Sequence, residues 1–180
     1  MKPSHTARPR AGLAAIFLAS AIPLAATQVS GGGAAAAQAP NACALLSAEE
    51  VQALAPKEHV ADGASRTVGA LESFGCRYTW GTGTGRFTLD VTVNPASHVF
   101  AGMNADAIKR GLLSSVVPET ADAAIPDVGD AAVFKASSPL YAVASAYLKD
   151  RILAVSLDGI DAAERKGELI SLLKSAASRL

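Results

Sequence analysis

Two consecutive segments near the middle of the chain carry the alternating pattern of a half-buried β-hairpin. In residues 86–94, apolar side chains occupy every second position and polar side chains lie between them (apolar Phe87, Leu89, Val91 and Val93; polar Thr88, Asp90 and Thr92). Successive side chains of a strand point to opposite faces, so one face of this strand belongs to a core and the other to solvent. Residues 75–80 form the preceding strand. The glycine-rich residues 81–85 lie between two strands, which favours a hairpin turn over a phosphate-binding loop, since the latter would precede a helix.

The apolar positions also predict the register of this hairpin. Matching the two apolar faces gives the pairs Tyr78 with Leu89 and Trp80 with Phe87. The same register sets Arg77 opposite Asp90 on the outer face, where opposite charges form a cross-strand ion pair of modest strength.

A helix start follows the first cysteine. Ser47 and Glu50 have the spacing of a capping box, and Leu46 with Val51 has the spacing of a hydrophobic staple. We expect this helix to reach about Ala55, because the residue before a proline disfavours helical geometry.

Hydrophobic periodicity predicts the remaining elements. Ser97 begins a second helix that extends to about Leu113, with an inner side made of Phe100, Met103, Ala107 and Leu112. Three short strands follow near residues 131–135, 141–148 and 151–157, the last two joined by a tight turn.

The last segment predicts a helix that closes the fold. Asp161 and Glu164 form an acidic capping pair, and the apolar stripe consists of Leu169, Leu172, Leu173, Ala176 and Leu180. The resulting order is α-β-β-α-β-β-β-α. We therefore expect an α+β fold, an antiparallel sheet of hairpins packed against helices.

Residues 1–26 have the pattern of a secretory signal peptide. Basic residues without any acid precede the apolar residues 11–26, and a helix of about 24 Å is too short for a hydrocarbon core of about 30 Å. Residues 27–40 are rich in glycine and alanine, which predicts a flexible leader. Residues 41–180 then form a single domain, and we expect a periplasmic or secreted protein.

Charge argues against two classes of partner. Without residues 1–26 the chain has 13 basic and 16 acidic residues, a net charge of −3. This balance gives no electrostatic basis for binding nucleic acid or anionic lipid. We expect a monomer with no stable membrane insertion after cleavage of the signal peptide.

The two cysteines, Cys43 and Cys76, predict a disulfide in an oxidising compartment. The bridge would close about 34 residues and stabilise the fold by about 3–4 kcal/mol. A redox pair would have Cys-x-x-Cys spacing. A zinc site would need more ligands than His59 and His98 supply, and no lipid-attachment run precedes Cys43.

Three short motifs resemble those of a large group of bacterial exported domains. They are Cys-Ala-Leu-Leu-Ser at residues 43–47, Cys-Arg-Tyr-Thr-Trp at residues 76–80 and Val-Gly-Asp-Ala-Ala at residues 128–132. Many members of this group are actinobacterial lipoproteins or secreted proteins. The resemblance implies an exported, disulfide-linked α+β domain and supplies no catalytic residue. This chain departs from the group in lacking the lipid-attachment signal.

No motif in the chain specifies a cofactor, a metal or a nucleophile. Asp122, Asp127 and Asp130 suggest calcium, but their setting is equally good turn chemistry. Trp80 with Tyr78 suggests either an aromatic platform or core packing.

The hairpin is the candidate binding surface, and its site residues are Arg77, Thr79 and Asp90 on the solvent-facing side together with the aromatic Trp80. We expect a non-enzymatic exported domain that binds a small ligand or an envelope protein on this face. One alternative is an enzyme, or an enzyme regulator, whose site combines dispersed residues such as Asp90, His98 and Asp130. Another is a purely structural envelope component.

Overall fold

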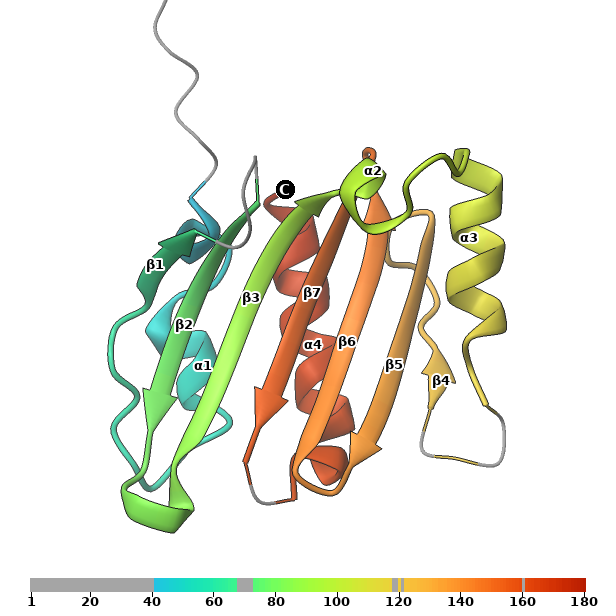
Figure 1. Ribbon diagram of the computed structural model, residues 1–180. Helices are drawn as coiled ribbons and strands as arrows, with labels where there is room; N and C mark the ends of the chain where they lie inside the picture. Colours follow the sequence, from blue (N-terminus) through green and yellow to red (C-terminus); the bar gives the residue numbers. More distant parts are fainter. Residues whose placement is uncertain (1–40, 68–72, 118–119, 121, 160) are drawn as a thin grey trace, which may run out of the picture. The chain divides into compact units, whose positions relative to one another are not determined.

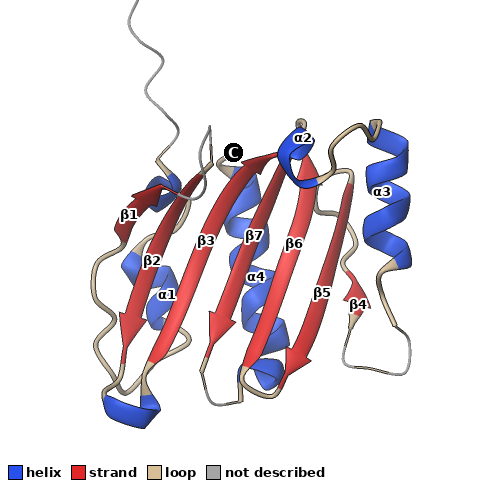
Figure 2. Cartoon of the chain, viewed as in Figure 1, coloured by secondary structure: helices blue, strands red, loops and turns tan. Residues whose placement is uncertain are grey.

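A computed structural model describes residues 41–67, 73–117, 120, 122–159 and 161–180. The predicted signal peptide and leader lie outside these residues. Within the described residues the strands form one antiparallel sheet of seven strands in the order β1-β2-β3-β7-β6-β5-β4 (Figures 1 and 2). The strands are β1 (Ala64–Thr67), β2 (Phe74–Trp80), β3 (Phe87–Pro95), β4 (Ala123–Ala124), β5 (Ala131–Ser138), β6 (Tyr141–Leu148) and β7 (Arg151–Asp158). The predicted α+β class is confirmed.

The hairpin β2–β3 has the register that its apolar faces predict. Tyr78 pairs with Leu89, Trp80 with Phe87 and Arg77 with Asp90. A second meander, β5–β6–β7, supplies the other half of the sheet. The turn between β6 and β7 has positive φ angles at both Lys149 (50°) and Asp150 (59°), as a tight two-residue hairpin turn requires. The halves join where β3 pairs with β7.

Helices α1 (Ala48–Gln52) and α4 (Lys166–Ser178) lie on one face of this sheet (Figure 1). The main core lies between them and the inward side chains of the strands. Four of the five residues of the predicted stripe on α4 are buried, and Leu180 packs partly buried at the end. The predicted disulfide between Cys43 and Cys76 is confirmed, and it joins the short 3-10 helix η1 (Ala42–Ala44) to β2.

Glu50 connects the two helices of this layer. Ser47 and Glu50 form the predicted capping box at the start of α1. The Glu50 carboxylate also accepts hydrogen bonds from Arg179 Nη1 (2.6 Å), Arg179 Nη2 (2.8 Å) and Ser175 Oγ at the end of α4. The hydrogen bonds from Arg179, with those from Ser175 and the Ser47 backbone, lower the pKa of Glu50 from 4.5 to about 2.

Helix α3 (Ala105–Ser114) lies on the other face, over β5 (Figure 1). Its buried residues Ile108 and Leu112 pack with Val133, Tyr147 and neighbouring side chains in a second, smaller core. Because α3 is offset toward the β5 side, it leaves the middle of this sheet face uncovered.

The prediction of one continuous helix from Ser97 to Leu113 is wrong. The chain forms α2 (Ala96–Val99), a turn in which Gly102 has a φ of 76°, and then α3. Asn104 caps the second start by accepting a hydrogen bond from the Ala107 backbone N–H (2.9 Å). The break turns Met103 out to 54% exposure, so it does not belong to the inner side.

Three further details differ from the prediction. Strands β1 and β4 were not expected, since β1 is mostly exposed and β4 has only two residues. Asp161 adopts a left-handed conformation (φ 58°) and makes no side-chain cap; a 3-10 turn, η3 (Ala162–Arg165), leads into α4 instead.

None of the helices in the described ranges is long and apolar enough to cross a membrane.

We predict that Glu50→Gln lowers the free energy of unfolding by about 1–2 kcal/mol at pH 7, because it removes a charged partner of Arg179. The folded pKa is depressed, so the stabilisation is complete above the ordinary pKa of 4.5 and disappears as pH falls toward 2. Urea denaturation at pH 7 and pH 3 measures the effect. The matched control is Glu49→Gln on the exposed side of α1. An equal loss in both variants, or a loss independent of pH, would contradict the prediction.

We predict that reduction of the disulfide lowers the free energy of unfolding by about 3 kcal/mol, since the unfolded chain regains the freedom of a long loop. Urea denaturation with and without a thiol reductant measures the difference. A variant with Cys43→Ser and Cys76→Ser is the control, and its stability should not respond to the reductant. Equal stability of the oxidised and reduced wild type would refute this expectation.

Candidate functional site

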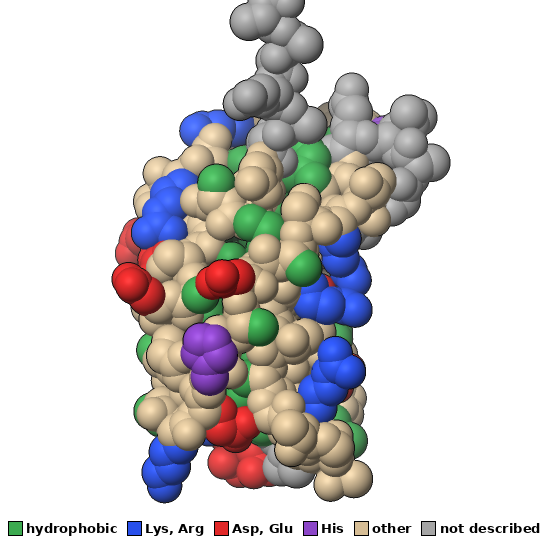
Figure 3. All heavy atoms as spheres, turned by 90° about the vertical axis from the view of Figure 1, so that its left-hand side faces the viewer, with side chains coloured by type: hydrophobic (Ala, Val, Ile, Leu, Met, Phe, Trp, Pro, Cys, Tyr) green, Lys and Arg blue, Asp and Glu red, His purple; other side chains and the backbone are tan. Residues whose placement is uncertain are grey.

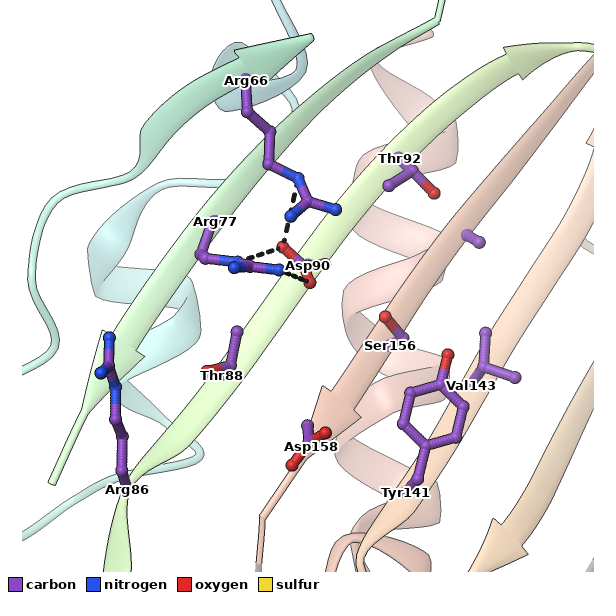
Figure 4. A pocket seen from close by; sticks show the side chains of 11 residues that line it. Arg66, Arg77, Arg86, Thr88, Asp90, Thr92, Tyr141, Val143, Ser156 and Asp158 are labelled. Atoms are coloured by element: carbon purple, nitrogen blue, oxygen red, sulfur yellow. Dashed lines mark hydrogen bonds and ion pairs between the residues drawn. The ribbon is translucent and has the colours of Figure 1, made fainter. Parts of the chain in front are cut away.

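The uncovered sheet face contains a hollow of about 640 Å³, which we call the sheet basin (Figure 4). Its lining comes from five strands and the residue preceding β3. The lining residues are Arg66, Arg77, Arg86, Thr88, Asp90, Thr92, Tyr141, Val143, Ala154, Ser156 and Asp158. They lie on the face opposite α1 and α4.

The strand register explains why these residues meet. Residues paired across antiparallel strands share a face. One row across the sheet therefore consists of Arg77, Asp90, Ser156 and Val143. The row on one side consists of Arg66, Gly75, Thr92 and Ala154, and the row on the other of Thr88, Asp158 and Tyr141.

Side-chain size produces the hollow. The strand at its centre, β7, contributes only the short side chains of Ala154, Ser156 and Asp158. Long arginine side chains rise on the β1–β2 side, and the ring of Tyr141 stands on the β6 side (Figure 4). The floor is therefore low between two higher walls.

Asp90 forms ionic contacts with two of the arginines. Arg77 Nε donates to Asp90 Oδ1 (2.9 Å) and Arg77 Nη2 donates to Oδ2 (2.8 Å), a bidentate pair. These hydrogen bonds, together with the negative charges of Asp90 and Asp158, raise the pKa of Arg77 against a smaller opposing effect of desolvation. Both residues of this predicted ion pair therefore line the basin.

Arg66 approaches the same carboxylate from the edge strand. Its Nε lies 3.6 Å from Asp90 Oδ1, as a charge contact without a hydrogen bond. This Nε is buried and has no hydrogen-bond partner in the described part of the chain. Gly75 lies between Arg66 and Thr92 in the row, and its missing side chain leaves room for Arg66 to reach across β2 toward Asp90. The Asp90 carboxylate thus contacts the guanidinium groups of both Arg77 and Arg66.

The remaining charges are Arg86 and Asp158. The basin therefore combines three guanidinium groups with two carboxylates, for a formal charge of +1. Figure 3 views the β1 side of the sheet and shows basic side chains gathered along its right-hand margin. Hydroxyl groups of threonine, serine and tyrosine supply further donors and acceptors.

The other two predicted site residues lie outside the lining. Thr79 is half-buried on the open face and pairs with Thr88. Trp80 is only 5% exposed; it belongs to the main core and stacks on Phe87 with ring centroids 5.3 Å apart. The position of Trp80 is therefore that of a core residue and not that of an exposed aromatic platform.

Sequence reasoning missed most of the basin. Arg66 lies in a strand without an alternating pattern. Ala154, Ser156 and Asp158 do alternate with buried residues along β7, a signal that was present. Their proximity to Asp90 depends on β3 pairing with β7, which no local pattern specifies.

The residues considered for metal or dispersed catalytic sites have other settings. Asp122 Oδ1 accepts a hydrogen bond from the Ala136 backbone N–H (3.1 Å), and Asp130 contacts Lys109 Nζ (3.6 Å). Asp127 occupies a turn with a φ of 61°. Neither His98 nor Asp130 lines the basin with Asp90. Across the described ranges, no three histidine, cysteine or acidic side chains are grouped to hold a metal ion.

Comparison with protein-family models, curated proteins and solved structures finds no match to this chain. The resemblance to exported bacterial domains therefore stays a prediction from short motifs.

We predict that Arg77 and Asp90 are coupled by about 1 kcal/mol, the upper range for a cross-strand pair whose carboxylate is mostly covered. A double-mutant cycle with Arg77→Gln and Asp90→Asn, followed by urea denaturation, measures the coupling. Asp90→Asn alone should cost more than Arg77→Gln alone, because it also removes the partner of Arg66. The matched control cycle joins Arg77→Gln to Asp62→Asn, an exposed residue outside the basin, and should give no coupling. The reverse order of the two single effects would contradict the shared role of Asp90.

Proposed function

We propose that this protein is an exported binding domain that captures a small polar ligand in the sheet basin. The observation that carries the proposal is a hollow of about 640 Å³, on the sheet face that the helices leave uncovered, lined by charged and hydroxyl side chains. This volume falls within the range of about 300–1,000 Å³ that small-molecule sites occupy in proteins.

The distribution of polar and apolar side chains on this face favours a small ligand over a protein partner. A protein interface of stable complexes has an apolar centre surrounded by a polar rim. The basin has the reverse arrangement, since polar side chains such as Ser156 lie at its centre. Among the exposed large apolar side chains of the described residues, Tyr141 forms one wall of the basin. The others lie outside the lining: Val99, Met103, Leu113, Val117 and Leu140.

The proposal of an exported location rests on two features. The disulfide between Cys43 and Cys76 is consistent with an oxidising, extracytoplasmic compartment. The pattern of residues 1–26 is typical of a signal peptide.

Amide NMR spectra of the ¹⁵N-labelled protein test the proposal. Sulfate, glucose, glucuronate and triglycine are added separately, and we expect at least one to shift resonances from several strands that line the basin. Ser156→Leu fills the floor and should abolish these shifts. The matched control, Ser137→Leu, changes an exposed residue of β5 outside the lining and should preserve them. If no probe shifts basin resonances, or if Ser156→Leu leaves the shifts intact, the proposal fails. Shifts caused only by a protein from the same envelope would favour the alternative partner.

A further inference from the structure

Building on the proposed function, we infer that the basin takes a short zwitterionic ligand, with its anionic end at Arg66 and its ammonium end at Asp158 and Tyr141. A peptide of two or three residues with free termini has this chemistry. The inference rests on how the charges are separated across the basin.

Arg66 supplies the anionic subsite. Within the described residues its guanidinium makes no hydrogen bond, and its only ionic partner is Asp90, which already accepts two hydrogen bonds from Arg77. Its side chain is 35% exposed, so a ligand can reach it. A guanidinium binds a carboxylate through parallel N–H donors. An incoming carboxylate would therefore find guanidinium donors that no described residue accepts from.

Asp158 supplies the cationic subsite. It is exposed, and its carboxylate makes no salt bridge or hydrogen bond with the described residues, although its charge acts on Arg77 at longer range. Its cross-strand partner is Tyr141, whose 38% exposed ring stands beside it (Figure 4). A carboxylate next to an aromatic face is a favourable setting for an ammonium group, which gains both a charge partner and a cation–π contact.

The register gives the spacing between the two subsites. Asp90 pairs with Ser156, and Asp158 lies two residues beyond Ser156 on the adjacent strand. One strand spacing and two residues along the strand correspond to about 8 Å between the Asp90 and Asp158 backbones. The Arg66 side chain reaches Asp90, so a ligand that joins Arg66 to Asp158 must span a similar distance. An extended dipeptide measures about 7 Å and a tripeptide about 10 Å.

The same charges disfavour other small ligands. A dianion would place its second charge against Asp158, and a dication would face the arginine side of the basin. A neutral sugar would use the hydroxyl groups and leave both charged subsites without a partner. The separation of Arg66 from Asp158 therefore selects a ligand with opposite charges at its ends.

Calorimetric and NMR titrations at low salt test the inference with three probes. These are triglycine, N-acetyltriglycine, which lacks the ammonium group, and triglycinamide, which lacks the carboxylate. In the wild type we expect triglycine to bind at least about fivefold more tightly than either blocked peptide, the loss of one exposed charge pair. Equal affinity for triglycine and a blocked peptide would overturn the assignment of the corresponding subsite.

Two variants connect each end of the ligand to its residue. Asp158→Asn should remove the preference for triglycine over N-acetyltriglycine and keep the preference over triglycinamide. Arg66→Gln should do the opposite. Asp62→Asn and Arg110→Gln, both exposed residues outside the lining, are the matched controls and should keep both preferences. A variant that weakens all three peptides equally would refute the end-specific contacts.

The outcome also separates this inference from the proposed function. If sulfate, glucose or glucuronate shifts basin resonances while none of the three peptides does, the inference is wrong and the basin is a site for another ligand class. If no compound shifts basin resonances, both are wrong.

Discussion

The antiparallel pairing of β3 with β7 is the contact on which both the core and the basin depend. On the covered face it aligns Leu89 with Leu157 and Val91 with Val155. On the open face it aligns Asp90 with Ser156. A slip of one residue would turn the side chains of one strand to the wrong face. The burial of the apolar set therefore determines which polar residues meet in the basin.

The unequal covering of the two sheet faces makes this polar set accessible. Helices α1 and α4 cover one face, and the Glu50–Arg179 contact joins the start of α1 to the end of α4. On the other face α3 packs over β5 and contributes to a small second core. The centre of that face has no helix over it. It is hollow because β7 contributes short side chains there, while β1 and β2 contribute long ones.

The charges in the basin also follow from this geometry. Cross-strand pairing brings Arg77 to Asp90, and the absence of a side chain at Gly75 lets Arg66 reach the same carboxylate. Two cations then share one anion, while Asp158 lies one strand away and makes no salt bridge or side-chain hydrogen bond with the described residues. Positively charged donors of Arg66 therefore face one end of the basin, and the negatively charged acceptors of Asp158 face the other end. This separation of charge is the basis of the proposed ligand chemistry.

Local patterns in the sequence determined the α+β class, the register of β2 with β3, the Ser47–Glu50 capping box and the Arg77–Asp90 pair. Each depends on residues close in sequence or on one hairpin, where strand and helix periodicity are direct signals. The break at Gly102 was missed because the apolar spacing of residues 97–113 suits a helix, whereas a positive φ and the Asn104 cap interrupt it. Within the site, Arg77 and Asp90 could be predicted, but Arg66, Tyr141 and Asp158 could not. Only the tertiary structure brings Arg66 and the Tyr141–Asp158 pair beside Asp90, because no local pattern encodes the pairing of β1 with β2 or of β3 with β7.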